Sequence, residues 1–336
     1  MKKYLLICIL FFSSFASNAE ELIADENITE QLDCFRSIFS DYDSWRSFIE
    51  SQRKKRIKST EKLAKGMAQF DSMFGEHKFN HYRQNLSCIT FKYQVDGLDI
   101  DGYLIKPKSP NKKALPVLVY NRGGNGSFGS VVFGSMMHNL FPIANEGFVI
   151  IGSQYRQSSS KDILLDEFGG KDVNDVTELL KYIPKIKNAD SNRIGMFGAS
   201  RGGMQTFLAA RHSKIIKAIA TIASPTDLLK ELDFRPEMEK VFVHRIPNYE
   251  KNKIAELEKR SVLKWVDQLP HDVPILLLHG ENDKRVPVNS SIELAAALSK
   301  NEIPHKLVVY PRDDHGLMNN KAAANEELVS WFEKYL

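Results

Sequence analysis

Hydrophobic residues follow two different periods along most of this chain. Apolar runs of about four to eight residues, bounded by Gly, Pro, Asn or Asp, are typical of strands, whereas apolar positions that recur every three or four residues indicate helices. By these criteria the predicted strands are residues 89–95, 98–105, 116–120, 148–151, 193–197, 218–222, 275–278 and 306–310. The predicted helices are residues 136–144, 173–182, 205–211, 291–299 and 322–335.

The order of these elements predicts the fold class. Asp96-Gly97 is a hairpin-type turn that joins the first two strands. Strands and helices then alternate, which favours a mostly parallel, doubly wound α/β sheet with helices on both faces. We predict one such domain over residues 86–336. Residues 225–269 are charged and longer than a simple crossover, so we expect a helical insertion above the sheet.

Residues 20–85 precede this domain and have a different pattern. Apolar residues recur there at helical spacing in two groups, Leu32, Phe35, Ile38 and Phe39, then Trp45, Phe48 and Ile49. No catalytic constellation accompanies them. We therefore predict a helical N-terminal cap that packs on the main domain.

The first 19 residues have the composition of a secretory signal peptide. Lys2 and Lys3 precede an apolar run over residues 4–12, and small residues lead to Ala19, where we expect cleavage. The apolar run is too short to cross a bilayer, which needs about 20 residues. The sequence thus predicts a secreted or periplasmic protein without an integral membrane segment in its mature chain.

Net charge bears on the kind of partner, and the cysteines bear on possible disulfide formation. Lys and Arg number 46 against 42 Asp and Glu, a formal net charge of +4, and we predict no nucleic-acid or membrane partner. The basic run at residues 53–58 fits one solvated helix face. Cys34 and Cys88 are the cysteines beyond the signal peptide, and they are either a disulfide or two buried thiols.

One segment predicts nucleophilic chemistry. The strand at 193–197 runs into Gly198-Ala-Ser200-Arg-Gly202-Gly203, and a helix follows. This strand–turn–helix setting is the nucleophile elbow of the α/β-hydrolase fold. A side chain at Gly198 or Gly202 would collide with the neighbouring backbone, and the first N–H groups of the new helix suit a developing oxyanion beside Ser200.

A serine nucleophile needs a histidine base and an acid that orients it, and in this fold they follow in the order Ser, Asp or Glu, His. Asp283 comes just after the strand at 275–278, and His315 comes just after the strand at 306–310. Because the carboxyl ends of parallel strands lie at one edge of a sheet, we predict that Ser200, Asp283 and His315 form a catalytic triad.

Other residues near these positions leave alternatives open. His279 competes with His315 as the base, although its place at the strand end favours packing there. Glu281 is an alternative acid, and Asp313 or Asp314 can instead cap the last helix. We expect substrate-pocket residues within 225–269 and around Tyr155, and we predict neither a cofactor nor a metal.

These motifs resemble the catalytic domain of the prolyl oligopeptidase family of serine peptidases, over roughly residues 86–336. The likeness lies in the doubled glycine after Ser200, in His-Gly-x-x-Asp-x-x-Val-Pro around Asp283, and in the acidic-His-Gly sequence around His315. It implies that Ser200 is the nucleophile, Asp283 the orienting acid and His315 the base. The β-propeller that many members carry is not expected here, since about 65 residues in front of the domain cannot build one.

The resemblance also implies two oxyanion donors. The first is the backbone N–H of Arg201. The second is often a tyrosine hydroxyl ahead of a glycine pair, but Arg122 stands there, before Gly123-Gly124. Either a backbone N–H at Gly123 or the Arg122 guanidinium would have to substitute.

The resulting prediction is acyl transfer on a small peptide or ester substrate, with a peptidase favoured over a carboxylesterase of the same fold. A scaffold that keeps these residues without activity is a third alternative. A fourth comes from Gly124–Gly129, which matches the Gly-x-Gly-x-x-Gly of dinucleotide-binding oxidoreductases. The acidic residue that such folds place after the second strand is missing at residues 152–155.

Overall fold

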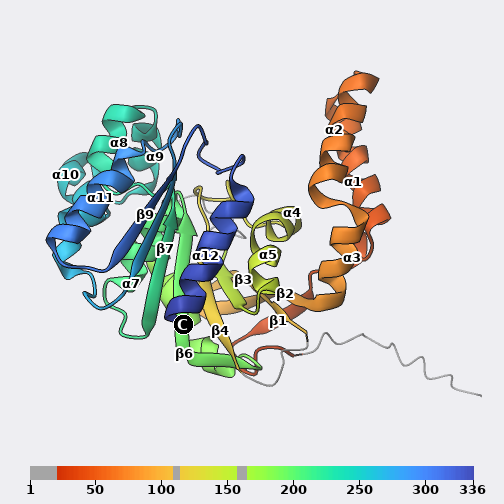
Figure 1. The fold of residues 1–336 in the computed structure, drawn as a ribbon, viewed down its shortest axis with the longest axis horizontal. Coiled ribbons are helices and arrows are strands. Elements are labelled where there is room, and N and C mark those ends of the chain that lie inside the picture. The colour runs from red at the N-terminus through yellow and green to blue at the C-terminus, as the bar shows by residue number, and fades with distance from the viewer. Residues whose placement is uncertain (1–20, 109–113, 157–164) are drawn as a thin grey trace, which may run out of the picture.

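The computed structural model describes residues 21–108, 114–156 and 165–336, and the predicted signal peptide lies outside them. These residues form a nine-stranded sheet in the order β1-β2-β3-β5-β4-β6-β7-β8-β9 (Figure 1). The strands are β1 Thr29–Asp33, β2 Leu86–Val95, β3 Leu98–Pro107, β4 Leu115–Asn121, β5 Val149–Ser153, β6 Ala189–Ala199, β7 Ile216–Ile222, β8 Ile275–Gly280 and β9 His305–Tyr310.

The sheet is antiparallel at one edge and parallel beyond it. β1, β2, β3 and β5 pair antiparallel in turn, and the β2–β3 register closes with Val95 opposite Leu98 across the predicted turn. All pairings from β5 through β4 to β9 are parallel. This arrangement confirms the predicted α/β-hydrolase class, and it brings the carboxyl ends of β6, β8 and β9 to one edge.

Helices cover both faces of this sheet because alternate residues of each central strand point in opposite directions. In β4, Val117 and Val119 pack into one apolar layer with α6, α7 and α11, while Leu118 packs into the other with α5 and α12. The helices are α4 Phe133–Ser135, α5 Phe141–Asn145, α6 Asp172–Tyr182, α7 Arg201–Ala210, α11 Asn289–Lys300 and α12 Lys321–Tyr335, and a π-helix over Met136–Leu140 joins α4 to α5.

The N-terminal segment differs in part from its prediction. The helix expected through Leu32 and Phe39 is wrong, because residues 29–33 form the edge strand β1 on β2, and Ser37–Phe39 is a single 3-10 turn. The remaining helices are α1 Tyr42–Arg56, α2 Thr60–Phe74 and α3 Glu76–Asn85, which stand together beside α4 (Figure 1). Trp45 joins them to the main domain, with its ring 4.8 Å from Phe70 and 5.1 Å from Phe133.

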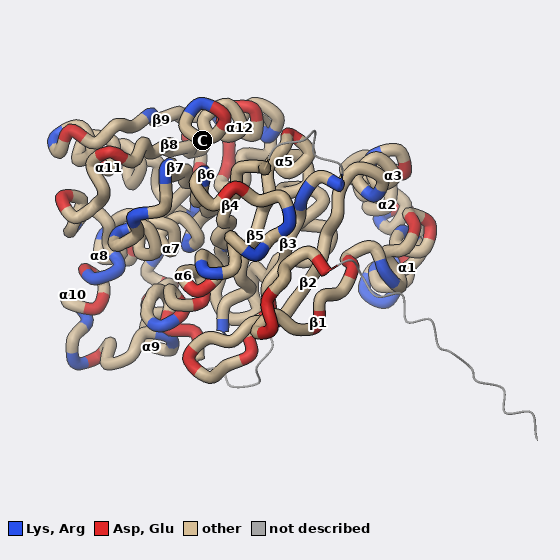
Figure 2. The backbone as a smooth tube through the Cα atoms, turned by 90° about the horizontal axis from the view of Figure 1, so that it is seen from below, with Lys and Arg blue, Asp and Glu red and all other residues tan. Residues whose placement is uncertain are grey.

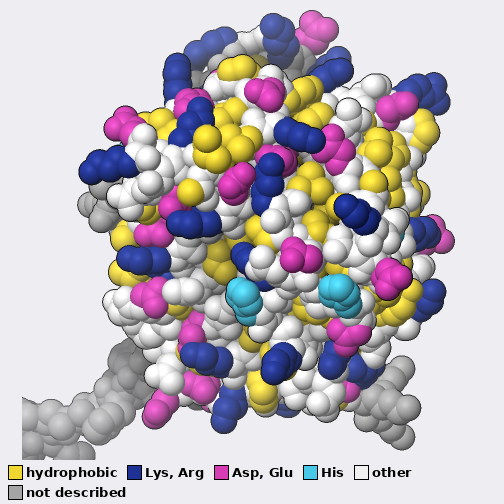
Figure 3. All heavy atoms as spheres, turned by 90° about the vertical axis from the view of Figure 1, so that its left-hand side faces the viewer, with side chains coloured by type: hydrophobic (Ala, Val, Ile, Leu, Met, Phe, Trp, Pro, Cys, Tyr) yellow, Lys and Arg dark blue, Asp and Glu magenta, His cyan; other side chains and the backbone are white. Residues whose placement is uncertain are grey.

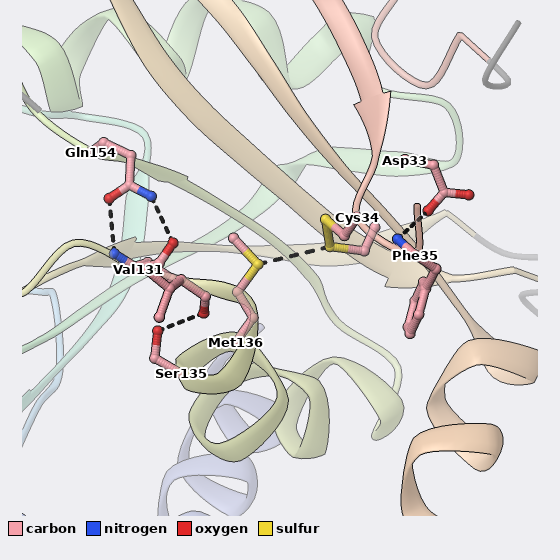
Figure 4. The surroundings of a disulfide bond; sticks show 9 residues. Asp33, Cys34, Phe35, Val131, Ser135, Met136 and Gln154 are labelled. Carbon is pink, nitrogen blue, oxygen red and sulfur yellow. Dashed lines mark hydrogen bonds between the residues drawn. A yellow bond between two sulfur atoms is a disulfide. The ribbon is translucent and has the colours of Figure 1, made fainter. Parts of the chain in front are cut away.

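A disulfide bond connects Cys34 to Cys88, which resolves the alternative left open by the sequence (Figure 4). The Cys34 N–H also donates to the Cys88 carbonyl at 2.9 Å, and Met136 Sδ lies 3.9 Å from the Cys88 sulfur. The bond therefore anchors the end of β1, just before α1, to the second strand of the sheet.

The segment 225–269 forms three α-helices, α8 Leu228–Phe234, α9 Met238–Arg245 and α10 Tyr249–Lys259 (Figure 1), followed by short 3-10 helices at Val262–Lys264 and Val266–Gln268. They have a small apolar cluster of their own, in which Leu228 and Phe242 pack against Phe168 and against Met204 of α7. Because α7 starts at the elbow, this insertion sits next to the predicted nucleophile.

Basic and acidic residues are interspersed in both views of the molecule. Lys and Arg positions lie among Asp and Glu positions over the backbone (Figure 2), and both kinds occur together on the face shown in Figure 3. In the described part of the chain, no helix combines the length and apolar character needed to cross a bilayer.

Candidate active site

Ser200 sits in the tight turn between β6 and α7. Its backbone has φ 56° and ψ −130°, a region that non-glycine residues rarely occupy and that costs about 1–3 kcal/mol. The turn is held on both sides, since Ser200 N–H donates to Ile222 O at 2.8 Å and Gly203 N–H donates to Ser200 O at 2.8 Å. The serine is thus fixed at the carboxyl edge of the sheet.

The glycines on either side of Ser200 make this turn possible. A Cβ atom on Gly198 would overlap the backbone of Gly202, and a Cβ atom on Gly202 would overlap the Asn121 carbonyl at the end of β4. Gly203 is equally confined, by the Ser224 side chain at 2.5 Å. Strand, turn and helix pack so closely that only glycine fits at these positions.

Asp283 and His315 meet although they follow different strands. His315 Nδ1 lies 2.6 Å from Asp283 Oδ2, at the ends of β8 and β9. The other carboxylate oxygen, Oδ1, accepts the backbone N–H groups of Arg285 at 2.7 Å and Val286 at 3.1 Å. The carboxylate is therefore held in one orientation, and it aligns the imidazole.

The charged form of Asp283 is stabilised despite its burial. Burial alone would raise the pKa of Asp283, but hydrogen bonds from His279 and His315 outweigh it and hold this pKa well below its ordinary value. His279 is fully buried, with Nδ1 2.7 Å from Ser291 Oγ and Nε2 3.2 Å from Asp283 Oδ2. It is a partner of Asp283, and it does not line the cavity that holds Ser200.

The alternative acids have other partners. Glu281 is exposed and accepts the Arg312 N–H at 3.0 Å. Asp313 is fully buried, and its carboxylate accepts backbone N–H groups from Asp314, Asn319 and Asn320. That pattern stabilises the turn before α12, so neither carboxylate contacts the His315 ring.

Ser200 and His315 line one cavity of about 640 Å³. The described residues form no hydrogen bond between Ser200 Oγ and the His315 ring. Such contacts are often loose in free enzymes and shorten once substrate is bound. The position of both side chains on one cavity, with Asp283 behind the imidazole, is the arrangement that acyl transfer needs.

Arg122 does not supply the second oxyanion donor through its side chain. The guanidinium is 1 % exposed and donates to backbone carbonyls, to Gln154 O from Nε at 2.9 Å and to Gly126 O from Nη2 at 2.7 Å. That alternative is wrong because all three guanidinium nitrogens already donate to backbone carbonyls, either within the loop at residues 123–128 or at Gln154 beyond β5. The other alternative, the backbone N–H of Gly123, stays a prediction. Gly123 lies close to the serine, since a Cβ atom built on it would be 3.2 Å from Ser200 Cβ.

Two residues beside Ser200 have backbone N–H groups without a backbone acceptor in the described part of the chain. Arg201 is the first residue of α7, so its N–H has no acceptor within the helix. The Gly123 N–H donates to no backbone acceptor among the described residues. Both adjoin Ser200 on the cavity wall, where a developing oxyanion would form.

The Arg201 side chain holds the glycine-rich loop at residues 122–129 in place, a role that the sequence did not suggest. Its guanidinium is buried between Asp166 at 2.7 Å and Asp172 at 2.6 Å, and it donates to Gly124 O at 2.9 Å. Burial would lower the pKa of Arg201, but these carboxylates raise it above its ordinary value. Asp166 also accepts the Gly126 N–H at 2.5 Å.

The contacts of Arg201, Asp166 and Gly126 argue against a dinucleotide-binding loop at residues 124–129. In a dinucleotide fold the N–H groups of the glycine-rich loop meet a phosphate. Here the Gly126 N–H meets a carboxylate of the chain itself, and Arg122 fills the inside of the loop. In the described part of the chain, no group of three or more His, Cys, Asp or Glu side chains could hold a metal ion.

The remaining cavity wall has two parts. Leu228, Met238, Val241 and Phe242 of the insertion line one part, as expected for residues 225–269. Tyr155, which was expected at the pocket, is instead fully buried, with its hydroxyl donating to Arg122 O at 3.1 Å. The other part consists of side chains from β4, the π-helix, α5 and α12: Tyr120, Asn139, Leu140, Ile143, Lys321, Asn325 and Leu328.

Glu231 of α8 lines the cavity on the side formed by the insertion. Glu231 is 5 % exposed, and its Oε1 accepts a hydrogen bond from Ser290 Oγ at 2.9 Å. Burial raises its pKa from 4.5 to about 7, because few dipoles replace water around the charged form. Glu231 was not predicted as a site residue, because no motif surrounds it in the sequence.

Comparison with known proteins connects this site to a family. The prolyl oligopeptidase family matches residues 134–336. The chain is similar to the acylamino-acid-releasing enzyme of Mus musculus, with 26% identity over 267 residues that span 72% of this chain and 35% of the relative. It is also similar to the uncharacterized peptidase YtmA of Bacillus subtilis, with 25% identity over 241 residues, 71% of this chain and 90% of the relative.

The same fold occurs among solved structures. The Pyrococcus horikoshii acylaminoacyl peptidase superposes with a TM-score of 0.62 at 22% identity, covering 76% of this chain and 43% of that chain. This chain therefore spans less than half of that structure and about a third of the Mus musculus relative.

Proposed function

Since this chain belongs to the prolyl oligopeptidase family, we propose that it is an exported serine peptidase that cleaves small peptides through Ser200, Asp283 and His315. One observation carries the proposal. His315, whose Nδ1 lies 2.6 Å from Asp283 Oδ2, lines the same cavity as a serine in a strained elbow. Nucleophile, base and orienting acid are the three parts of this chemistry.

In the proposed reaction, Asp283 keeps the proton of His315 on Nδ1, which leaves Nε2 free to act as a base. Nε2 takes the proton of Ser200 Oγ as that oxygen attacks the peptide carbonyl. The N–H groups of Arg201 and Gly123 stabilise the oxyanion. His315 then protonates the leaving amine, and a water molecule repeats the sequence on the acyl-enzyme.

Export is supported by two independent features of the chain. The first 19 residues have the composition of a signal peptide, as argued above. The Cys34–Cys88 disulfide is of the kind that persists in oxidising compartments and is rare in the cytosol. Both point to a secreted or periplasmic protein.

The test of the mechanism is covalent labelling. A fluorophosphonate probe should label the wild-type protein and leave Ser200→Ala unlabelled, with the fold of both checked by circular dichroism. A folded wild type that stays unlabelled would overturn the proposal.

The test of the substrate class is a side-by-side rate measurement on aminoacyl and prolyl p-nitroanilides and on acyl p-nitrophenyl esters. A peptidase cleaves the anilides, with kcat lowered by about 10⁶-fold in Ser200→Ala. Hydrolysis of the esters alone would identify a carboxylesterase of the same fold.

A further inference from the structure

Arginine and lysine side chains line the cavity beside Ser200, with Arg235 in the insertion and Arg285 and Lys321 outside it. Lys321 is the first residue of α12, and it lines the cavity with Asn139 and Asn325. The apolar neighbours on this wall, such as Leu140 and Leu328, belong to the layer beneath α12. The insertion wall, by contrast, belongs to the cluster of Phe168 and Phe242.

Lys321 has no acidic partner among the described residues. Lys306, for comparison, pairs with Glu327 at 2.6 Å, whereas no ion pair of Lys321 occurs among the described residues. The side chain is half-buried, and burial lowers its pKa to about 8, so the amine is still largely protonated at neutral pH. A partly desolvated charge without a counterion is costly, and an anionic ligand would remove that cost.

A second side chain beside Lys321 is also unsatisfied. Both ring nitrogens of His138 are buried without a hydrogen-bond partner in the described residues. Burial lowers the pKa of His138, and the positive charges of Lys321 and Lys78 lower it further. Positive charge therefore gathers around His138, from Lys321 at the cavity wall and from Lys78.

We propose that Lys321, with the Asn139 and Asn325 amides, binds a carboxylate group of the substrate and so determines specificity. This inference rests on the proposed function, because it assigns a substrate class to the same cavity. An ammonium group and two amides are the donors that a carboxylate accepts best outside an arginine pair. The carboxylate has two sources, the C-terminus of a short peptide on the leaving-group side or an acidic acyl group on the other side.

The test compares matched substrates that differ only in this charge. For the acyl side, the pair is N-succinyl- and N-succinamoyl-alanine p-nitroanilide. For the leaving-group side, the pair is acetyl-trialanine as free acid and as C-terminal amide. Lys321→Met should lower the preference in kcat/KM for the acid of one pair by about 10- to 100-fold, and Lys321→Arg should restore part of it.

Lys334→Met is the matched control, since Lys334 is exposed in the last turn of the same helix. It should keep the wild-type preference. An equal loss in Lys334→Met would show a general charge effect and overturn the proposal. An unchanged preference in Lys321→Met for both pairs would overturn it as well.

The failure of this inference can be told apart from failure of the proposed function. The p-nitrophenyl esters of the same two acyl-alanines report on Lys321 even if anilides are not cleaved. Binding of N-succinyl-alanine and acetyl-trialanine to Ser200→Ala, measured by calorimetry, reports on it without any hydrolysis. In that variant, an added Lys321→Met exchange should weaken binding of one of the two acids by a similar factor.

Discussion

Asp283 Oδ2 lies 2.6 Å from His315 Nδ1 and 3.2 Å from Nε2 of the buried His279, so one carboxylate oxygen contacts two imidazoles. One ring faces the cavity and the other is enclosed beneath it. The orientation of His315, the candidate base, therefore depends on Asp283, which does not itself line the cavity. This relationship gives the first prediction.

Asp283→Asn should lower kcat by about 10⁴-fold with little change in KM, because the amide no longer favours the Nδ1–H form of His315. Steady-state kinetics on the best anilide or ester substrate measure it. Glu281→Gln is the control, since that side chain is exposed and bonds only to Arg312 N–H. If Glu281→Gln were the more damaging of the two, the acid would be assigned wrongly.

Arg201→Met should destabilise the fold by about 3–5 kcal/mol, because it leaves Asp166 and Asp172 as buried charges without their cation. Urea unfolding followed by tryptophan fluorescence measures the loss. Arg193→Met, which removes a half-exposed arginine paired with Asp190, should cost about 1 kcal/mol or less. Similar losses in both variants would contradict the importance of the buried network.

Glu231→Gln should change the pH dependence of stability. Between pH 4.5 and 7 the folded protein keeps a proton on Glu231 that the unfolded chain releases, so stability falls as pH rises through this window. The loss amounts to at most about 3 kcal/mol. The variant lacks this loss, so its free energy of unfolding minus that of wild type should be larger at pH 8 than at pH 5, which means that the variant gains stability relative to wild type as pH rises.

Denaturant unfolding at both pH values measures this difference. A constant difference between Glu231→Gln and wild type across the range would show that the Glu231 carboxyl has an ordinary pKa. Glu302→Gln, at an exposed position, should show no such trend.

Replacing Cys34 and Cys88 together by Ser should lower the free energy of unfolding by about 2–4 kcal/mol, because the bond closes a loop across 54 positions of sequence. Reduced wild type should match the double variant in the same denaturation experiment. Labelling at Ser200 should persist in both, since the bond lies in the N-terminal edge of the sheet, away from the cavity lining. Loss of labelling in the folded double variant would contradict this separation.

The sequence predicted the parts of this protein that local chemistry determines. Eight strands were located because their apolar runs end at turn residues, and the elbow was located because Gly198 and Gly202 admit no Cβ atom. The edge strand β1 was missed, since its residues are mostly exposed and have no alternating pattern. Its formation depends on pairing with β2, a partner about 60 residues away in the chain.

The missed residues of the candidate site depend on contacts between distant segments. Nothing near Arg122 indicates that its guanidinium would be used up by the carbonyls of Gln154 and Gly126. Likewise, Asp166 lies shortly before α6 and Asp172 is the first residue of α6, where an acidic side chain is ordinarily taken to stabilise a helix start, yet both pair with Arg201. A charged residue reveals its partner only when the fold is known.

The closeness of Gly198 and Gly202 to neighbouring backbone has a consequence for how this scaffold can diversify. The rim that holds the serine accepts almost no variation, because any added atom displaces a strand or a helix. The helical insertion and the start of α12 are under no such constraint, and they form the two walls of the cavity. Substrate preference can therefore change through substitutions in the insertion and at the start of α12 while the turn that holds Ser200 stays the same. Redesign of specificity should begin with these cavity-lining residues.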